Sequence, residues 1–402
     1  MLFTPDRHEP LTEEPFTEEA AGEAVEAIAR RAEAELERAD GRWPLDAEDR
    51  DSDDEGPPTV VYHGAAGIAW ALGELADGGY CEPVVDRALV EALEAKHAAE
   101  PDPYEYAANG VWFGPAGALA VAEHRWPDEA RRDRLFELAR ASLTDPALDI
   151  MFGHPGYMAL AAELHARTGE ERWAELWAAG AGRLLDEWRH DGELGGWFWT
   201  QVFGGKDARY VGAAHGLVGN LNVLLRGGEL LSEDRRTEVE RRAVETLTRL
   251  AFVEDGLANW STGMGDPLVA NDRIRVQWCH GAAGVVATLA KIATENEEWG
   301  ELLLAGGRLV WTAGPIRDAP GLCHGTAGNA YALLALFERT GDEQWLDRAR
   351  AFAWHAALQA ESRAATLGRG HHSLFTGDEG VAMCLAACIE ADAQFPVADR
   401  LI

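Results

Sequence analysis

Seven copies of a Gly-x-x-Gly pattern, each leading into an apolar run, constrain the fold of this 402-residue chain more than any other feature. Paired glycines let a chain turn sharply and let neighbouring helix ends approach closely, at a cost of about 1 kcal/mol relative to alanine wherever a glycine lies inside a helix. A pattern that occurs seven times therefore indicates architecture before it indicates function. The first glycines of the seven copies are Gly64, Gly114, Gly153, Gly216, Gly281, Gly325 and Gly377.

Each copy is expected to start a buried helix that is followed by a half-exposed one. After Gly325 the apolar run has almost no polar face, and Thr340-Gly-Asp ends it. Apolar residues then recur at helical spacing from Trp345 to Ala356, among charged ones. Such a helical pair cannot bury its own apolar face and must stack on neighbours. Seven pairs can form an open solenoid, but a closed ring also removes the exposed ends. The prediction is an all-α protein, an (α/α)7 toroid.

The residues before the first copy are predicted to belong to the same domain as the ring. Apolar residues with helical spacing, from Val25 to Leu36, predict a helix over residues 19–39. An acidic, proline-ended linker follows over residues 46–58. We therefore expect residues 1–58 to supply an outer helix and the linker, residues 59–402 to form the toroid, and the whole chain to be one domain.

Charge and cysteine content limit the partners and the compartment. The net charge is −33, and the surface of such a chain repels phosphate, which argues against a nucleic-acid partner. No run of 18 apolar residues occurs, so no membrane span is expected. Five cysteines, an odd number, fit a reducing and therefore cytoplasmic location better than a disulfide framework. Cys384 and Cys388 share one face of an apolar helix and are interpreted as buried core thiols rather than metal ligands.

Three of the seven copies carry reactive side chains: His215 before Gly216, the pair Cys279-His280, and the pair Cys323-His324. If all inner helices begin on the same rim, these side chains meet at one mouth of the ring. Cys279, Cys323 and His324 form a three-ligand set for zinc with one position left for an exchangeable ligand, which is typical of catalytic sites. The alternative is a closed structural site with His280 as the fourth ligand.

Four strings in the sequence resemble the lanthionine synthetase C-like family, and the likeness covers all seven copies. The chain is most similar to the stand-alone, eukaryotic-type members that bind glutathione. The cyclases of the family often have tyrosine after the first zinc cysteine, whereas this chain has His280, as the glutathione-binding members do. The strings are Tyr210-Val-Gly-Ala-Ala-His215-Gly-Leu-Val-Gly219, Trp278-Cys279-His-Gly281, Gly321-Leu-Cys323-His324-Gly-Thr-Ala-Gly-Asn-Ala-Tyr331 and Ser373-Leu-Phe-Thr-Gly377.

The resemblance implies the same zinc ligands as the residue types do, and it adds three residues. The histidine and aspartate that are implicated in proton transfer in the cyclases match His215 and Asp149, and a family arginine matches Arg275. Each also has a plainer interpretation: His215 as a helix cap, Asp149 as a carboxylate that meets a helix dipole, and Arg275 as a surface cation. Lys206 and Arg209, in the loop before His215, are weaker candidates for binding an anionic group of a substrate.

The expected chemistry is addition of a thiol to a dehydroamino acid. A thiol bound at zinc becomes a thiolate well below its free pKa of about 8.5 and can attack the β-carbon of dehydroalanine or dehydrobutyrine in a peptide or protein. His215 is expected to protonate the resulting enolate, with Asp149 orienting the imidazole and Arg275 stabilising the enolate oxygen. His371 and His372, before the seventh copy, can reach the same mouth if the repeat geometry holds.

Two functional classes remain open at this level. The first is a zinc-dependent enzyme that forms thioethers, with glutathione or a peptide cysteine as the thiol. The second is a non-catalytic zinc scaffold that binds glutathione or a partner protein. Carbohydrate-active (α/α) barrels share the architecture but use paired carboxylates, and the cysteines at this rim argue against that class.

Overall fold

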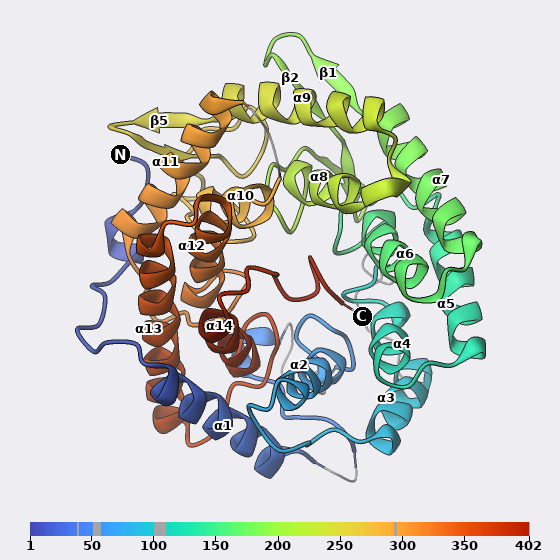
Figure 1. The fold of residues 1–402 in the computed structure, drawn as a ribbon, viewed down its shortest axis with the longest axis vertical. Helices are drawn as coiled ribbons and strands as arrows, with labels where there is room; N and C mark the ends of the chain where they lie inside the picture. The colour runs from blue at the N-terminus through green and yellow to red at the C-terminus, as the bar shows by residue number, and fades with distance from the viewer. Residues whose placement is uncertain (38–39, 51–57, 100–109, 293–295, 402) are drawn as a thin grey trace.

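The computed structural model describes residues 1–37, 40–50, 58–99, 110–292 and 296–401. Within them, fourteen α-helices form two concentric rings, with even-numbered helices inside and odd-numbered helices outside (Figure 1). The predicted all-α toroid of seven helical pairs is therefore confirmed. The inner helices are α2 (Ala65–Asp77), α4 (Pro115–Arg125), α6 (His154–Thr168), α8 (Leu217–Arg226), α10 (Ala282–Leu289), α12 (Thr326–Thr340) and α14 (Asp378–Glu390).

The inner helices are buried on nearly all sides, and every one of them has the first glycine of a Gly-x-x-Gly copy as its N-cap residue. In α10, for example, all eight residues are buried. Because these helices have no solvated face, their apolar sequences lack the polar stripe of a surface helix. The repeated glycines thus mark one structural position seven times.

The outer helices are amphipathic and bury one face against the inner ring. Several begin at a side-chain cap, such as Thr17, Asp128, Asn296 and Asp342, which accepts a hydrogen bond from a backbone N–H of the first turn. The seven outer helices are α1 (Glu18–Glu35), α3 (Arg87–Ala99), α5 (Glu129–Ser142), α7 (Glu171–Glu187), α9 (Glu233–Leu250), α11 (Glu297–Ala313) and α13 (Glu343–Leu367).

The N-terminal helix closes the ring. The α1 helix contacts α14, and α14 contacts α2, so the two ends of the repeat array meet. Polar side chains hold this junction, because His372 lies between Glu379 of α14 and Glu35 of α1, with hydrogen bonds of 2.7 and 3.0 Å. The predicted helix over 19–39 ends earlier, at Glu35. Part of the predicted linker, residues 51–57, lies outside the described residues, and the single-domain organisation stays a prediction.

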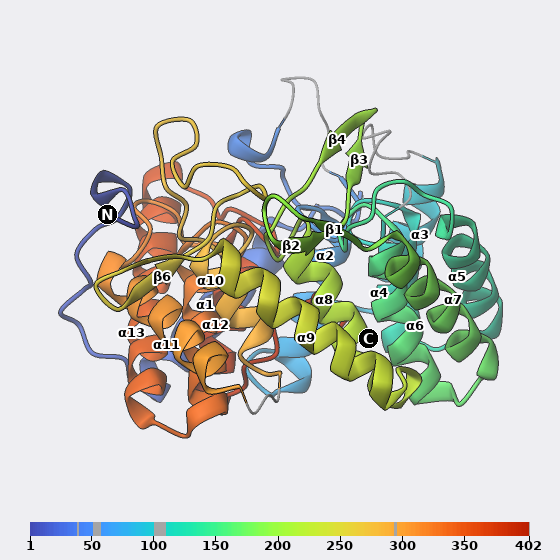
Figure 2. The ribbon, with the colours of Figure 1, turned by 90° about the horizontal axis from the view of Figure 1, so that it is seen from above.

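Three short β-hairpins were not predicted from the sequence. They pair β1 (Arg189–Asp191) with β2 (Gly196–Phe198), β3 (Gln201–Phe203) with β4 (Lys206–Ala208), and β5 (Phe252–Glu254) with β6 (Leu257–Asn259). The first two hairpins occupy the connection between α7 and α8. Figure 2 shows β3 and β4 standing out from one face of the ring.

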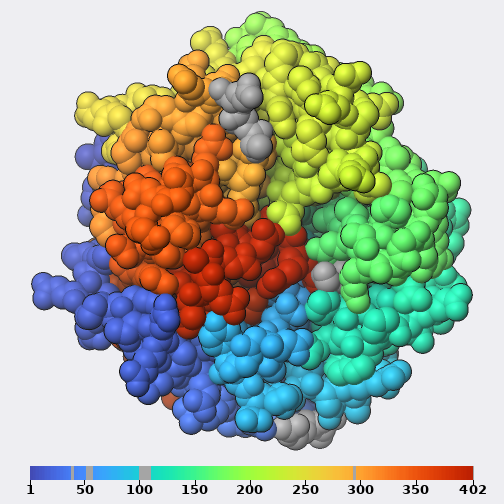
Figure 3. Space-filling view, viewed as in Figure 1, coloured from blue at the N-terminus to red at the C-terminus, as the bar shows by residue number. Residues whose placement is uncertain are grey.

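The segment after α14 crosses the centre of the ring instead of ending at the edge (Figure 1). The C-terminal part of the chain fills the middle of the face seen in Figure 3. Phe395 stacks on Trp278 with ring centroids 4.3 Å apart and planes 7° apart. Farther along, the buried Asp399 forms an ion pair with Lys291 and accepts a hydrogen bond of 3.0 Å from the Asn222 amide.

Candidate metal centre and cavity

One short loop precedes each inner helix, and all seven loops share a register. We call the residue immediately before each N-cap glycine the rim position. Five of the seven rim positions line one cavity of about 400 Å³, so the loops do bring their side chains to a common mouth. Those five are His63, Phe113, Phe152, His324 and Thr376, and the other two are His215 and His280.

The backbone of these loops explains why glycine is required. Gly281 has φ of 103°, in the left-handed region that side chains disfavour. The second glycine of the fifth copy, Gly284, leaves room for the carbonyl of Trp278, which a Cβ atom there would meet. The fifth and sixth loops then pair, because Cys279 N donates to the Cys323 carbonyl at 3.0 Å.

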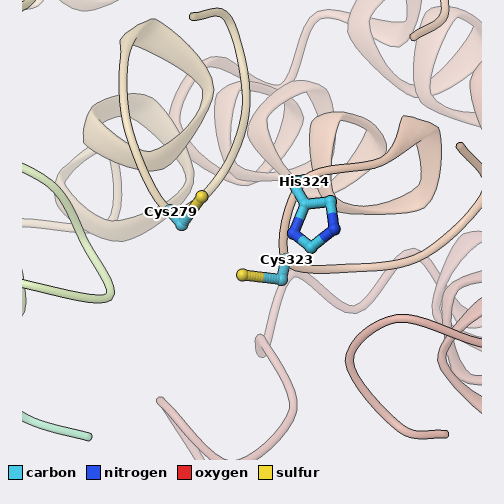
Figure 4. Close-up of side chains that lie close together, drawn as sticks. All are labelled: Cys279, Cys323 and His324. Atoms are coloured by element: carbon cyan, nitrogen blue, oxygen red, sulfur yellow. The ribbon is translucent and has the colours of Figure 1, made fainter. Parts of the chain in front are cut away.

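This pairing brings the three predicted metal ligands together. One ligand atom each from Cys279, Cys323 and His324 lies within 4.8 Å of the others, with both cysteines buried and the histidine exposed. Figure 4 shows the two cysteines on neighbouring loops, with the His324 ring beside Cys323. Among the described residues, this is the cluster of His, Cys, Asp and Glu side chains with the spacing of a metal site, and His280 is not part of it.

The two sulfurs have the environment that a soft metal requires. Their mutual hydrogen bond lowers the pKa of Cys279 well below its ordinary value and raises that of Cys323, because one proton is held between two buried sulfurs. Gln277 Nε2 also donates to Cys279 Sγ at 2.9 Å. A buried sulfur that accepts hydrogen bonds is suited to the thiolate form, which is the metal-binding form. The residues present therefore fit a zinc ion.

Tyr62 approaches the cluster from the first loop. Its ring stacks between Phe113 and Phe375, with centroid distances of 4.9 and 5.0 Å. Burial raises the pKa of Tyr62 well above its ordinary value, and a hydrogen bond with Cys323 raises it further. The phenol therefore remains neutral and able to donate to the cysteine sulfur.

His215 and Asp149 form a hydrogen-bonded pair, with Nδ1 and Oδ2 2.6 Å apart. Asp149 is fully buried, and its other oxygen accepts the backbone N–H groups of Met151 and Phe152 at 3.0 and 2.7 Å. The His215 ring stacks on Phe152 with centroids 4.9 Å apart and keeps 22% of its side chain exposed. Because Nδ1 is bonded to a carboxylate, Nε2 is the nitrogen left for a substrate.

His280 and Arg275 lie on the same side as His215. The His280 ring is 6.3 Å from that of His215 and 5.7 Å from that of Tyr210. Burial lowers the pKa of His280; the charge of Cys279 raises it, and those of His215 and Arg275 lower it. Arg275 is half-buried and donates to Thr262 Oγ1 at 3.3 Å.

Lys206 and Arg209, predicted to bind an anionic group, are both exposed and do not line the cavity. Arg209 forms an ion pair of 3.3 Å with Asp191 and covers the Phe198 ring at 3.9 Å. The hairpin that carries Lys206 approaches the site through another residue, because Phe203 of β3 meets the His215 ring edge-on at 5.6 Å.

Other residues of the cavity wall were not singled out in the sequence. Glu48, Asp49 and Asp318 give it an acidic side, and Arg363 adds a cation that is paired with Glu48 at 3.0 Å. The shared position before each N-cap glycine is the sequence signal that could have indicated His63 and the other rim residues. Of the two adjacent histidines before the seventh copy, His371 lines the cavity and His372 does not.

The double helical ring and the Cys-Cys-His cluster define an α/α toroid whose loops could hold a metal ion. The chain belongs to the lanthionine synthetase C-like family, whose model matches residues 57–399. The solved structure of nisin cyclase shares the fold, with a TM-score of 0.61 and 15% identity over 84% of this chain and 93% of that one.

Two curated relatives match part of the chain. Glutathione S-transferase LANCL1 of Danio rerio is 35% identical over 191 residues, 46% of this chain and 45% of the relative. LanC-like protein GCL1 of Arabidopsis thaliana is 34% identical over 195 residues, which are 47% of this chain and 43% of the relative. The aligned part thus spans less than half the length of either relative. No helix in the described part of the chain is long and apolar enough to cross a membrane.

Proposed function

We propose that this protein catalyses zinc-dependent thioether formation, in which a thiol adds to dehydroalanine or dehydrobutyrine in a peptide or protein. The observation that carries the proposal is the convergence of Cys279, Cys323 and His324 within 4.8 Å of one another, with His324 lining a cavity of about 400 Å³. Family membership and the name of the relative LANCL1, a glutathione S-transferase, support it.

The residues divide the work by their chemistry. Zinc held by Cys279, Cys323 and His324 would supply a Lewis acid that favours the ionised form of a bound thiol. His215 donates a proton to the α-carbon after the thiol sulfur has bonded to the β-carbon. Asp149 fixes the imidazole through Nδ1 and stabilises its charged form. Arg275, which lies near His280, stabilises negative charge on the enolate oxygen.

Glutathione is the proposed thiol, and a peptide cysteine is the alternative. His280 follows Cys279 here, as in the glutathione-binding members that the chain resembles. An anionic group of the substrate is proposed to meet Lys206 or Arg209, both exposed on or beside the β3–β4 hairpin. All five cysteines of the chain are free, which supports a reducing, cytoplasmic location.

Mass spectrometry of a dehydroalanine peptide incubated with glutathione and the zinc-loaded protein tests the proposal. We expect a glutathione adduct, loss of bound zinc and of adduct in Cys323→Ala, and no change in Cys388→Ala, a buried thiol remote from the rim. His215→Ala should lower the rate about 100-fold. Adduct formation no faster than in buffer, across several peptides and salt concentrations, would refute the enzyme.

A non-catalytic scaffold is the second candidate. It is favoured by the two backbone hydrogen bonds that Asp149 accepts, because these give the carboxylate a structural role independent of catalysis. If His215→Ala and the wild type convert the peptide equally, at the rate found in buffer, and both still bind glutathione, the protein is a binding module.

A further inference from the structure

A second carboxylate–imidazole pair lines the same cavity. His371 Nε2 lies 2.6 Å from Asp49 Oδ2, and Thr376 Oγ1 donates to the same oxygen at 2.9 Å. Both side chains are nearly buried, with 2% of His371 and 8% of Asp49 exposed. The pair has the same length as the His215–Asp149 pair. It lies with His324 in the wall of the cavity.

The hydrogen bonds around His371 define which nitrogen is basic. Burial raises the pKa of Asp49, but the hydrogen bond and charge of His371 and the hydroxyl of Thr376 bring it below its ordinary value. An ionised Asp49 accepts from Nε2–H, so the neutral ring keeps its lone pair on Nδ1. In the described part of the chain, Nδ1 has no hydrogen-bond partner although it is buried. Buried polar atoms are rarely left without a partner, so this lone pair is an unsatisfied acceptor on a residue of the cavity wall.

Charged groups from several elements surround the His371 ring. Asp46 and Asp49 act on it from the N-terminal segment, and Asp378 from the start of α14. The cations that act on these carboxylates include His63 on Asp49, Arg363 and Arg369 on Asp46, and Arg31 on Asp378. The backbone holds the ring in place, because His371 N donates to Asp378 Oδ2 at 3.2 Å.

We propose that His371, held by Asp49, is the base that removes the proton from the incoming thiol, in contrast to His215, which returns one to the product. This inference rests on the proposed function. The S–H bond breaks, its electron pair stays on sulfur, and an N–H bond forms at Nδ1. The sulfur then bonds to the β-carbon, the alkene electron pair moves to the α-carbon, and His215 supplies the proton there. His371 loses its proton to solvent and His215 regains one, so no oxidant or reductant is needed.

Separate groups on different loops suit a reaction with two proton transfers. His215 stacks on Phe152 and neighbours His280, whereas His371 belongs to the seventh loop and bonds the N-terminal segment. One imidazole can then accept a proton while the other donates one, so neither has to change its protonation state between the two steps.

Thiols of different acidity test the base directly. His371→Gln should lower kcat/KM for glutathione about 100-fold. The same variant should react normally with an aromatic thiol that is already ionised, because such a thiol needs no base. His355→Gln is the matched control, since His355 pairs with Glu9 at 2.8 Å and does not line this cavity. Equal losses for both thiols would assign His371 a structural role and overturn the proposal.

Proton release on thiol binding tests the base without turnover. Glutathione with a free thiol pKa of about 8.5 is about nine-tenths protonated at pH 7.5. Calorimetry in buffers of different ionisation enthalpy should find almost no proton released by the wild type, because His371 retains it. His371→Gln should release about one, and Asp49→Asn should release more than the wild type.

The two measurements separate the two proposals. If the wild type forms no adduct but retains the proton, thioether formation is refuted and the role of His371 as a base stands. If adduct forms while wild type and His371→Gln release equal protons and react equally with glutathione, the function stands and the base is refuted. Circular dichroism checks that the His371→Gln protein is folded. If it is not, Asp49→Asn is the second variant for the same test.

Discussion

His372 allows a quantitative prediction about stability. Its imidazole joins α14 to α1, because it forms hydrogen bonds with Glu379 and Glu35. Burial lowers its pKa, but the charge and hydrogen bond of Glu379 and the charges of Glu35 and Asp378 raise it from 6.5 to about 9. Since a shift of one unit corresponds to about 1.4 kcal/mol, the protonated ring stabilises the fold by about 3 kcal/mol. The raised folded pKa means that this stability is fully present below pH 6.5 and is lost as pH rises through 9.

Urea unfolding of the wild type and His372→Gln between about pH 7 and 10 measures this contribution. At pH 7 the variant should be about 3 kcal/mol less stable, and the difference should shrink towards pH 10. Asp378 does not interfere, because its pKa of about 6 lies below this range. His190→Gln, at a ring with 39% exposure, is the control and should unfold like the wild type. Parallel curves for the wild type and His372→Gln over the whole range would refute the reasoning.

Two further predictions concern the tail and the loops. Lys291→Met removes the nearer of two cations from the buried Asp399, which keeps only Arg226 at 3.7 Å, and should cost about 3 kcal/mol in urea unfolding. Lys96→Met, at a more exposed pair, should cost less than about 1 kcal/mol, and equal costs would contradict a buried ion pair. Gly284→Ala places a Cβ against a loop carbonyl and should lower both the bound zinc and the melting temperature. Gly182→Ala, the control, places its Cβ in open space and should lower neither. Normal zinc content in Gly284→Ala would show that the loop can shift.

The ring could be predicted because its determinants are local. Each glycine pair acts on the loop before it and the helix after it, so seven similar stretches indicate seven similar loops. The separation of 44 residues between Cys279 and Cys323 then places the two cysteines on adjacent loops. No long-range information was needed to expect that they meet, and the structure places their sulfurs side by side.

The rest of the cavity could not be predicted in the same way. Asp49 reaches His371 across 322 residues, from a segment that carries no Gly-x-x-Gly copy. Nothing in the local sequence distinguishes it from the other acidic residues nearby. Lys206 and Arg209 were suggested by their charge and by their nearness to His215 in sequence; both are exposed, on or beside the β3–β4 hairpin, and their role stays a prediction. Pairing of short strands depends on contacts that helical periodicity does not encode.

The tail shows how a distant segment can support the metal centre. Phe395 is 2% exposed and stacks on Trp278, the residue before Cys279, so it supports the loop that holds the first ligand. Phe395→Ala should cost about 3 to 5 kcal/mol in stability and should weaken zinc binding, because Trp278 can then move and carry Cys279 with it. Phe395→Leu keeps apolar volume beneath the indole and should recover most of both losses. Zinc affinity from competition with a chelator, measured below the unfolding temperature of each variant, separates the two effects. Wild-type zinc affinity in folded Phe395→Ala would mean that the pairing of Cys279 with Cys323 holds the loop without help from the tail.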